Sequence, residues 1–240
     1  MEGDRFYREN IKAKNLTFFQ ARVEQTDLYI GAQSDLEEKA VTFIKEYRQQ
    51  IEDYIKQHPE FLHSLIPIKP LKNAPLIVAD MCNASSLAKV GPMAAVAGAV
   101  SKFVGKKLLE FSDEVIVENG GDIFIKSNSD RTIGIYAGNS PLSGKIALRI
   151  NKDNTPCGIC TSSGTVGHSL SFGKADAAVV IHPDASVADA CATALGNMVK
   201  IPKDIEGALS YINNIPKIGG ALVICGEALG VIGDIEILRI

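Results

Sequence analysis

The most regular pattern of apolar and polar positions lies in the first quarter of the chain. Apolar residues recur there every three or four positions, and many of the positions between them are charged. This period predicts a helix that packs one face against a core. The apolar face consists of Leu36, Ala40, Ile44, Tyr47, Ile51 and Ile55. The segment from Ser34 to Glu37 resembles a capping box, so we expect the helix to begin at Ser34 and to end near His58.

Short apolar runs bounded by polar or glycine-containing segments predict strands elsewhere. The expected strands cover residues 16–23, 27–30, 76–79, 115–117, 123–125, 133–137, 145–150, 177–181, 222–225 and 235–238. Two further helices are expected, one opening at Gly91-Pro92 and one running from Ser186 to about Gly196. Hairpins and single strands that alternate with three or four helices favour an α+β fold with antiparallel sheet.

Composition narrows the classes of function. The chain has 240 residues, of which 46% are hydrophobic and 22% are charged. This globular composition fits a single domain over residues 1–240, or two closely fused halves. The net charge is −3, tryptophan is absent, and lysine and arginine do not cluster. A nucleic-acid partner is therefore not expected, because such proteins use a basic surface or a stacking platform.

Neither an export signal nor a membrane span is expected. The segment from Met1 to Lys14 is polar and charged, unlike a signal peptide. No apolar run approaches the roughly 18 residues that a membrane span needs. The number of cysteines is odd, which is typical of reduced thiols: Cys82, Cys157, Cys160, Cys191 and Cys225. We therefore expect a cytoplasmic protein without a membrane partner.

The first segment with a candidate chemistry runs from Val90 to Gly98. Gly91 precedes an expected helix start, and free N–H groups at such a start bind phosphate. The alternative, which the residues alone favour, is a helix buried against a sheet through its small side chains.

The second segment is Glu118-Asn119-Gly120-Gly121-Asp122. Its glycines would let a ligand approach the backbone, and Asp122 could bind a hydroxyl group. The alternative is a plain hairpin turn, since Asn-Gly is a favoured turn pair.

The third segment runs from Cys160 to His168 and is rich in hydroxyl groups and glycine. Its members are Thr161, Ser162, Ser163, Gly164 and His168, which together could cradle a phosphate or an oxyanion. An ordinary polar loop is an equal alternative. A Ser163/His168 hydrolase is disfavoured, because the Gly-x-Ser-x-Gly pattern of that class is absent from this segment.

The fourth segment places Asp189 and Thr193 four residues apart on one face of the expected helix. A carboxylate and a hydroxyl group suit Mg²⁺, with water and phosphate oxygens completing the coordination. The alternative is that the segment from Ser186 to Asp189 is a capping box and that Asp189 only serves the helix start.

Cys157 and Cys160 form a Cys-x-x-Cys pair. A redox or sulfur-handling role would place the pair at a helix start, and a zinc site would need two more ligands, for which His168 and His182 are candidates. A turn and a Thr/Ser loop are expected after the pair. Incidental thiols in a loop are therefore favoured over both alternatives.

In order and spacing, these segments resemble the motifs of ApbE-like flavin transferases, which move FMN from FAD onto a target protein. That family carries a Gly-Gly-Ile-Ala-Lys-Gly-type helix start, then Asn-Ala-Gly-Gly-Asp-Ile, Thr-Ser-Gly and Ala-Asp-Ala-Leu-Ala-Thr-Ala-Leu. The counterparts here lie at residues 90–98, 118–123, 161–164 and 188–195. The chain is most similar to a short cytoplasmic branch with the motifs VGPMAAVAG, VENGGD and CTSSGTVGH, from about Tyr7 to its last residue.

The resemblance implies two related halves of antiparallel sheet backed by helices, a T-fold-related architecture, with a cleft for a flavin or dinucleotide between them. It implies that Gly120, Gly121 and Asp122 line the nucleotide, FAD or FMN. It further implies that Asp189 and Thr193 hold Mg²⁺. A small-molecule nucleotide ligand and a homo-oligomeric state are the partners that we expect.

The chain also departs from the transferases. They carry a Tyr-x-Arg and a Ser-His-Ile-Ile-Asp-Pro stretch after Thr-Ser-Gly, whereas residues 181–184 here are only a partial echo, and the lysine of the helix-start motif is missing. These departures predict weak or no FMN transfer. Two hypotheses follow: a Mg²⁺-dependent transferase or pyrophosphatase acting on a flavin nucleotide or another phosphorylated small molecule, and a non-catalytic accessory or sulfur-handling protein that uses Cys160.

Overall fold

A computed structural model of the chain describes residues 15–165 and 171–240. The strands are β1 (Thr17–Val23), β2 (Thr26–Ala32), β3 (Val115–Asn119), β4 (Asp122–Lys126), β5 (Arg131–Gly134), β6 (Ile146–Ile150), β7 (Cys157–Ser162), β8 (Ala177–His182), β9 (Gly220–Cys225), β10 (Ala228–Gly233) and β11 (Glu236–Arg239). The helices are α1 (Glu37–Gln57), α2 (Glu60–His63), α3 (Leu76–Ala88), α4 (Val96–Leu108), α5 (Ala185–Met198) and α6 (Ile205–Asn213), with short 3₁₀ turns η2 (Pro92–Ala95), η3 (Lys152–Asn154) and η4 (Pro202–Asp204).

Eight strands form one antiparallel sheet in the order β1-β2-β3-β4-β7-β8-β9-β10. The order of elements repeats along the chain. The hairpin β1–β2, the helices α1 to α4 and the hairpin β3–β4 are followed, after β5 and β6, by the hairpin β7–β8, the helices α5 and α6 and the hairpin β9–β10. The two halves join where β4 pairs with β7. Mixed helices and antiparallel sheet confirm the α+β fold class.

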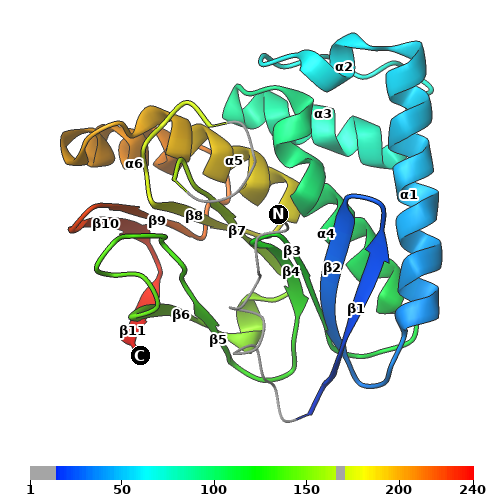
Figure 1. The fold of residues 1–240 in the computed structure, drawn as a ribbon, viewed down its shortest axis with the longest axis horizontal. Coiled ribbons are helices and arrows are strands. Elements are labelled where there is room, and N and C mark those ends of the chain that lie inside the picture. Colours follow the sequence, from blue (N-terminus) through cyan, green and yellow to red (C-terminus); the bar gives the residue numbers. More distant parts are fainter. Residues whose placement is uncertain (1–14, 166–170) are drawn as a thin grey trace.

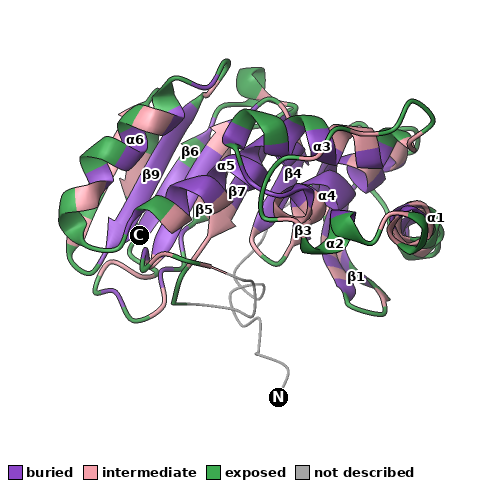
Figure 2. Ribbon diagram, turned by 90° about the horizontal axis from the view of Figure 1, so that it is seen from above, coloured by how far each residue is buried: buried purple, intermediate pink, exposed green. Residues whose placement is uncertain are grey.

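The large sheet separates two cores (Figure 1). Alternate residues of a strand point to opposite faces, so Val115 and Val117 face the helices while Ile116 faces the other side. On that other side lies a three-stranded sheet in the order β11-β6-β5. Figure 2 shows that the strands of the large sheet behind the helices are mainly buried. Apolar strands covered on both faces explain why the strand segments lack a polar side in the sequence.

Two expected helix boundaries need correction. Helix α1 begins at Glu37 rather than Ser34, and no side chain caps its Leu36 N-cap. Asp35, which lies one residue closer to the helix than Ser34, accepts the backbone N–H of Glu37 at 2.9 Å. The expected capping box is therefore wrong, although the apolar face of α1 is buried as expected. Gly91-Pro92 opens only the short turn η2, and α4 begins afterwards at Val96.

Residues 76–79 form the first turn of α3 and not the expected short strand. Ile77 and Val78 favour a strand by local preference, but both are fully buried in a helix that packs against other helices. The helix continues to Ala88 because no glycine or proline interrupts it. Residues 157–162, which were expected to be a turn and a loop, form β7, and the sequence pattern did not predict α6 or β10.

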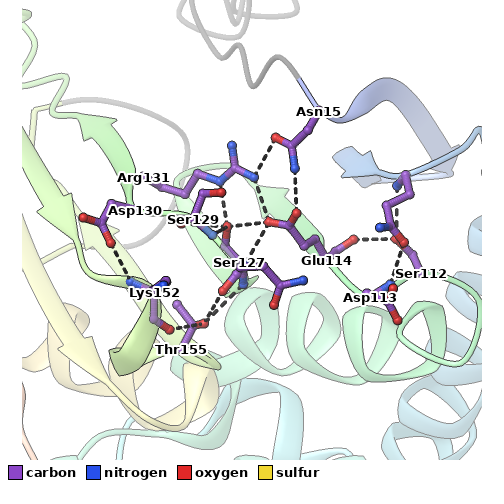
Figure 3. A network of polar contacts seen from close by, with 12 residues as sticks. Asn15, Ser112, Asp113, Glu114, Ser127, Ser129, Asp130, Arg131, Lys152 and Thr155 are labelled. Carbon is purple, nitrogen blue, oxygen red and sulfur yellow. Dashed lines mark hydrogen bonds and ion pairs between the residues drawn. The ribbon is translucent and has the colours of Figure 1, made fainter.

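A buried polar network joins the large sheet to β5 (Figure 3). The Glu114 carboxylate accepts hydrogen bonds from Ser127 Oγ at 2.7 Å, the Asn128 backbone N–H at 2.8 Å and Arg131 Nη2 at 2.8 Å. Its other oxygen accepts Asn15 Nδ2 at 2.6 Å. Burial by itself raises the pKa of Glu114, but these hydrogen bonds and the Arg131 charge outweigh it and lower the pKa. The network therefore holds a buried ion pair with both of its carboxylate oxygens hydrogen-bonded.

Within the described ranges, no single helix has the length and apolar character of a membrane span. Helix α3 and the segment Pro92–Leu108 reach that length only as a pair bent by 102°.

Candidate functional site

Asp122 is the first residue of β4 and directly follows the hairpin turn. Gly120 and Gly121 have φ values of 66° and 109°, which L side chains rarely adopt, and Asn119 pairs with Asp122 across the turn. Such a two-residue turn is the preferred connection of a tight hairpin. Because Phe124 of the same strand faces the helices, the two-residue period also points the Asp122 side chain towards them.

Asp189 lies in the second turn of α5, and Thr193 follows it one turn later on the same face. The helix is capped by Asp184, which accepts the Ser186 backbone N–H at 2.9 Å. The proposed capping box of Ser186 and Asp189 is therefore wrong. Asp189 instead accepts the Gly98 backbone N–H at 2.8 Å, so it serves the start of α4 from a neighbouring helix.

The carboxylate of Asp189 thus occupies the start of α4, in the segment for which phosphate binding was the less favoured of two alternatives. Gly98 is the third residue of α4, where backbone N–H groups have no partner within the helix. A carboxylate of the chain itself satisfies this position, and Gly91 lies before η2 instead. A Cβ atom on Gly91 would lie 1.7 Å from the Ser64 carbonyl oxygen. Gly91 is therefore required for close approach between backbone segments.

Small residues bring α4, α5 and β7 into close contact. A Cβ on Gly98 would lie 2.3 Å from the Ala185 carbonyl oxygen and 2.7 Å from Asp189 Cβ. A Cβ on Gly158 would lie 2.3 Å from Ala185 Cα. The glycine at position 98 therefore permits the hydrogen bond between α4 and Asp189.

The two carboxylates are buried, and neither has a cationic partner among the described residues. The side chain of Asp122 contains a buried oxygen, Oδ1, with no hydrogen-bond partner in the described part of the chain. Burial raises the pKa of Asp122 well above its usual value, and the nearby charge of Asp189 raises it further. Burial also raises the pKa of Asp189 to about 7, against the lowering effect of the Gly98 and Ala97 backbone amides. A buried carboxylate whose pKa is raised by a second carboxylate favours a proton or a cation beside it.

Asp122 and Asp189 line a cavity of about 650 Å³. Its walls come from the α2–α3 region, from the segment before α4 and from α5. The lining residues are Leu62, His63, Ser64, Leu65, Ala88, Lys89, Val90, Gly91, Met93, Ala94, Val96, Ala97, Asp122, Phe172, Asp189, Thr193, Ala194, Asn197, Met198 and Tyr211. This volume lies within the usual range for small-molecule sites, which are mostly apolar with a few polar groups.

The structure brings together some of the candidate residues and separates others. Gly91, Asp122, Asp189 and Thr193 line the cavity. The other candidates within the described residues are not among its lining: Gly120, Gly121, Thr161, Ser162, Ser163 and Gly164. His168 lies outside the described residues. Binding by the hairpin glycines and by the Thr161–Gly164 segment stays a prediction.

Residues 161–164 instead form the end of β7 and the turn after it. The Gly164 backbone N–H donates to the Ala175 carbonyl oxygen at 2.8 Å, and Ser163 Oγ accepts the Thr165 N–H at 3.1 Å. A Cβ on Gly164 would lie 2.3 Å from the Gly173 carbonyl oxygen. These contacts connect the turn to the segment before β8.

The cysteine pair lies inside the sheet, not in a loop. Cys157 and Cys160 belong to β7, and all five cysteines are buried and free. Burial raises the pKa of Cys157 to about 12, and burial together with Asp122 and Asp189 raises the pKa of Cys160. A buried, protonated thiol is a poor nucleophile, which weighs against sulfur handling by Cys160. Among residues 15–165 and 171–240, no group of three His, Cys, Asp or Glu side chains could hold a metal on its own.

The partial echo of the transferase motif at residues 181–184 lies away from the cavity lining. Asp184 pairs with the buried Lys102 at 2.7 Å, and Lys102 also contacts Asp80. His182 Nδ1 accepts the Asp184 backbone N–H at 2.9 Å. These residues tie α3, α4 and the start of α5 together.

Sequence reasoning did not identify several lining residues. Lys89 and Tyr211 come from the end of α3 and from α6, and Leu62 to Leu65 come from the segment around the end of α2. Ile205, Ala208, Leu209 and Ile212 recur at helical spacing and were the available signal for α6, which carries Tyr211. Neither α6 nor α2 was predicted. The run Lys89-Val90-Gly91, at the edge of a recognised motif, was the available signal for Lys89.

The site fits Mg²⁺ by its donors. Mg²⁺ is usually bound in proteins by one or two carboxylates plus water and ligand oxygens. Asp189 and Asp122 supply two carboxylates, Asp122 Oδ1 lacks a partner among the described residues, and Thr193 adds a hydroxyl group on the same wall.

Comparison with known proteins gives the same relationship. A family model described as "AbpE bacteria" matches residues 8–211. The chain belongs to this family. It is a member of the ApbE-like superfamily, as the motifs indicated.

Among relatives, a "UPF0280 protein" of Methanococcus aeolicus is 48% identical over 199 residues, which are 81% of this chain and 80% of that protein. A "UPF0280 protein" of Methanothrix thermoacetophila is 43% identical over 221 residues, covering 91% and 92% of the two chains. The match therefore covers about four fifths or more of each of these proteins.

Solved structures of similar fold include two flavin transferases. The flavin transferase ApbE from Vibrio cholerae matches with a TM-score of 0.62 and 11% identity over 90% of this chain and 96% of that one. The flavinyl transferase ApbE from Pseudomonas stutzeri, in its apo form, matches with a TM-score of 0.59 and 13% identity over 90% and 93%. At this identity the likeness shows the fold.

Proposed function

We propose that this ApbE-like protein binds a flavin nucleotide, FAD or FMN, or another phosphorylated small molecule, together with Mg²⁺ in the cavity, and that it transfers FMN weakly or not at all. The observation that carries the proposal is the pair of buried carboxylates, Asp122 and Asp189, at one wall of a cavity large enough for such a ligand. A buried carboxylate without a cationic partner costs folding free energy, and a cation would offset that cost. The structural neighbours from Vibrio cholerae and Pseudomonas stutzeri are flavin transferases, which supports the flavin part.

Asp189, Asp122 and Thr193 would hold the metal. Bound Mg²⁺ neutralises charge on phosphate oxygens and polarises them. Asp189 also receives the Gly98 N–H, which fixes the direction of its carboxylate before any ligand arrives. The apolar lining, including Met93, Met198 and Phe172, excludes water from the ligand and provides surface for a flat ring system.

Weak transfer is expected from what surrounds these carboxylates. A transferase needs a group that stabilises charge in the transition state and one that positions the acceptor hydroxyl. The residues that echo the transferase motif, His182 and Asp184, are engaged in contacts within the fold. Ground-state binding does not depend on groups that act only in the transition state, so binding and transfer are separable.

The first experiment tests binding. Purified protein is analysed for bound flavin and metal, and Mg²⁺ is then titrated by calorimetry into the protein and into Asp189→Asn. The variant should bind Mg²⁺ at least roughly tenfold more weakly, because one charged ligand carries much of the affinity for a hard cation. Asp153→Asn is the control, since Asp153 is exposed and lies outside the cavity. Equal Mg²⁺ affinity in a folded Asp189→Asn variant would restrict Asp189 to capping α4.

The second experiment tests transfer. The protein is incubated with FAD, Mg²⁺ and an acceptor peptide that contains Thr or Ser, and flavin attached to the peptide is read by in-gel fluorescence. We expect no band, or one that develops slowly. A rapid, Mg²⁺-dependent band would contradict weak transfer and favour a full transferase.

A further inference from the structure

Lys89 has an unusual backbone conformation at the edge of the cavity. It ends α3 with φ 57° and ψ 41°, the left-handed region. In the described ranges only two other non-glycine residues have a positive φ, namely Glu24 and Lys217. Glycine usually occupies this position at the end of a helix, because an L side chain is disfavoured there. Backbone strain of this kind is often associated with functional sites.

Lys89 is exposed at the surface and lines the edge of the cavity. Lys89 is the only lysine or arginine among the described residues that line the cavity. No carboxylate in the described part of the chain forms an ion pair with it. Its ammonium lies 5.9 Å from the centroid of the Tyr211 ring, and Tyr211 also lines the cavity. This distance is at the outer limit of a cation–π contact, so the ring leaves the ammonium available to a ligand.

The cavity is long enough to hold parts of a ligand that lie beyond the groups coordinated near Asp189. Asp189, Thr193 and Asn197 all line it at intervals of four residues along α5. At about 1.5 Å of rise per residue, this wall extends for roughly 12 Å. A ligand that follows the wall places groups well beyond those coordinated near Asp189.

We propose that Lys89 is an anion-binding residue of this cavity, which contacts a phosphoryl group of the ligand and so selects phosphorylated ligands over neutral ones of the same shape. The inference rests on the proposed function for the identity of the ligand. The position of Lys89 at the cavity does not depend on that function. A glycine at this position would relieve the strain of the left-handed backbone but would remove the charge. Two carboxylates and one ammonium then give the cavity the polarity of a metal–phosphate site.

Three variants separate the charge from the strain. Lys89→Met removes the ammonium and leaves the strained backbone, whereas Lys89→Gly removes both. Lys217→Gly is the matched control, because Lys217 is an exposed lysine with φ 64° that does not line the cavity. FMN and riboflavin are the probes, since they share the ring system and differ in the phosphate. Each is titrated with Mg²⁺ at low ionic strength.

We expect both Lys89 variants to bind FMN roughly tenfold more weakly than the wild type, which is the scale of a charge-assisted hydrogen bond. Riboflavin affinity should change by less than about twofold, and Lys217→Gly should bind both probes as the wild type does. Both glycine variants should raise the Tm by about 2 °C, because each relieves a left-handed side chain. Lys89→Met should not raise it. Unchanged FMN affinity in Lys89→Met would overturn the proposal.

Failure of the proposed function is distinguished by a further probe. If the wild type binds neither FMN nor FAD, the flavin assignment fails, and inorganic pyrophosphate with Mg²⁺ is titrated instead. Weaker pyrophosphate binding by Lys89→Met would then support the anion-binding role independently of flavin. Equal binding by the two proteins, or no binding by the wild type, would overturn it.

Discussion

The β3–β4 hairpin carries a buried carboxylate at each end, and the two ends are in opposite states. At the open end, Glu114 receives four hydrogen bonds and pairs with Arg131. At the turn end, Asp122 keeps an oxygen without a partner among the described residues and faces a second carboxylate, Asp189. The pKa is lowered at the first site and raised at the second. The comparison separates a carboxylate that stabilises the fold from one that, in the proposed function, would bind Mg²⁺.

The largest expected effect comes from removing Glu114, the fully hydrogen-bonded carboxylate at the open end of the hairpin. Glu114→Ala should lower the free energy of unfolding by about 3–5 kcal/mol, because Arg131 is left buried without its partner. Urea unfolding followed by circular dichroism measures the change. Arg149→Ala is the control, since Arg149 is half exposed and pairs with Asp130 at the surface, and it should unfold as the wild type does. A Glu114→Ala variant of wild-type stability would contradict the assignment of this end to folding.

The next effect tests the packing of α4 against α5 beside the turn end of the hairpin, where Asp122 and Asp189 lie. Gly98→Ala should cost about 2 kcal/mol or more, because its Cβ would lie 2.3 Å from the Ala185 carbonyl oxygen. It should also weaken Mg²⁺ binding by moving α4 away from Asp189. Gly207→Ala is the matched control, since Gly207 lies in α6 with no atom within 4 Å of an added Cβ, and alanine there should stabilise the helix slightly. Similar stability changes in the two variants would show that the close approach of α4 and α5 is dispensable.

The third prediction sharpens the comparison through pH. Asp189 has a pKa of about 7 in the folded protein, above its value of 3.8 without the fold, so the folded state binds more protons between those values. The contribution of Asp189 to the free energy of unfolding should therefore fall as pH rises from about 4 to about 7. Glu114 has the opposite sign, because its lowered pKa makes its contribution disappear as pH falls.

Denaturant unfolding at several pH values, without Mg²⁺, measures this dependence. Asp189→Asn should lose less stability than the wild type between about pH 5 and about pH 7, and Mg²⁺ should restore the wild type selectively. A wild type and variant with parallel pH profiles would place the pKa of Asp189 at an ordinary value.

The smallest expected effect concerns the neutral ligand. Thr193→Val keeps the shape of the side chain and removes its hydroxyl group. Mg²⁺ affinity should fall only a few-fold, because a neutral oxygen contributes less than a carboxylate to binding of a hard cation. The free energy of unfolding should stay within about 0.5 kcal/mol of the wild-type value. A loss as large as that of Asp189→Asn would instead make Thr193 an essential ligand.

Much of the fold and part of the site could be predicted from residue patterns. The amphipathic α1 and the β3–β4 hairpin carry local signals, a 3.6-residue period and an Asn-Gly turn, and both were predicted. Residues 76–79 were misread because Ile77 and Val78 look like a buried strand, whereas contacts with distant elements make α3 there. β10 has glycines at positions 230 and 233, and Gly230 leaves room for Ile205 of α6. That requirement arises only from tertiary packing.

The site shows the same division. Asp122, Asp189 and Thr193 were found because they stand in recognisable motifs, and they line one cavity. The role of Asp189 at the start of α4 could not be found, because Gly98 is 91 residues away in sequence. Lys89 and Tyr211 lie on different elements, the end of α3 and α6, and line the same cavity only in the folded chain. Motifs identified the residues with chemistry, and packing decided which of them share a cavity.

The last strand, β11, has a consequence for the order in which the molecule assembles. β5 and β6 are near neighbours in sequence, but β11 reaches back across the chain to pair Glu236 with Arg149. Closing so long a loop costs entropy before any contact compensates it, and such pairings slow folding. One edge of β6 would then stay unpaired while the rest of the chain collapses, and β11 would be the last strand to pair with it. The time that this edge spends open, rather than the final stability, would set how readily the chain associates with itself during folding.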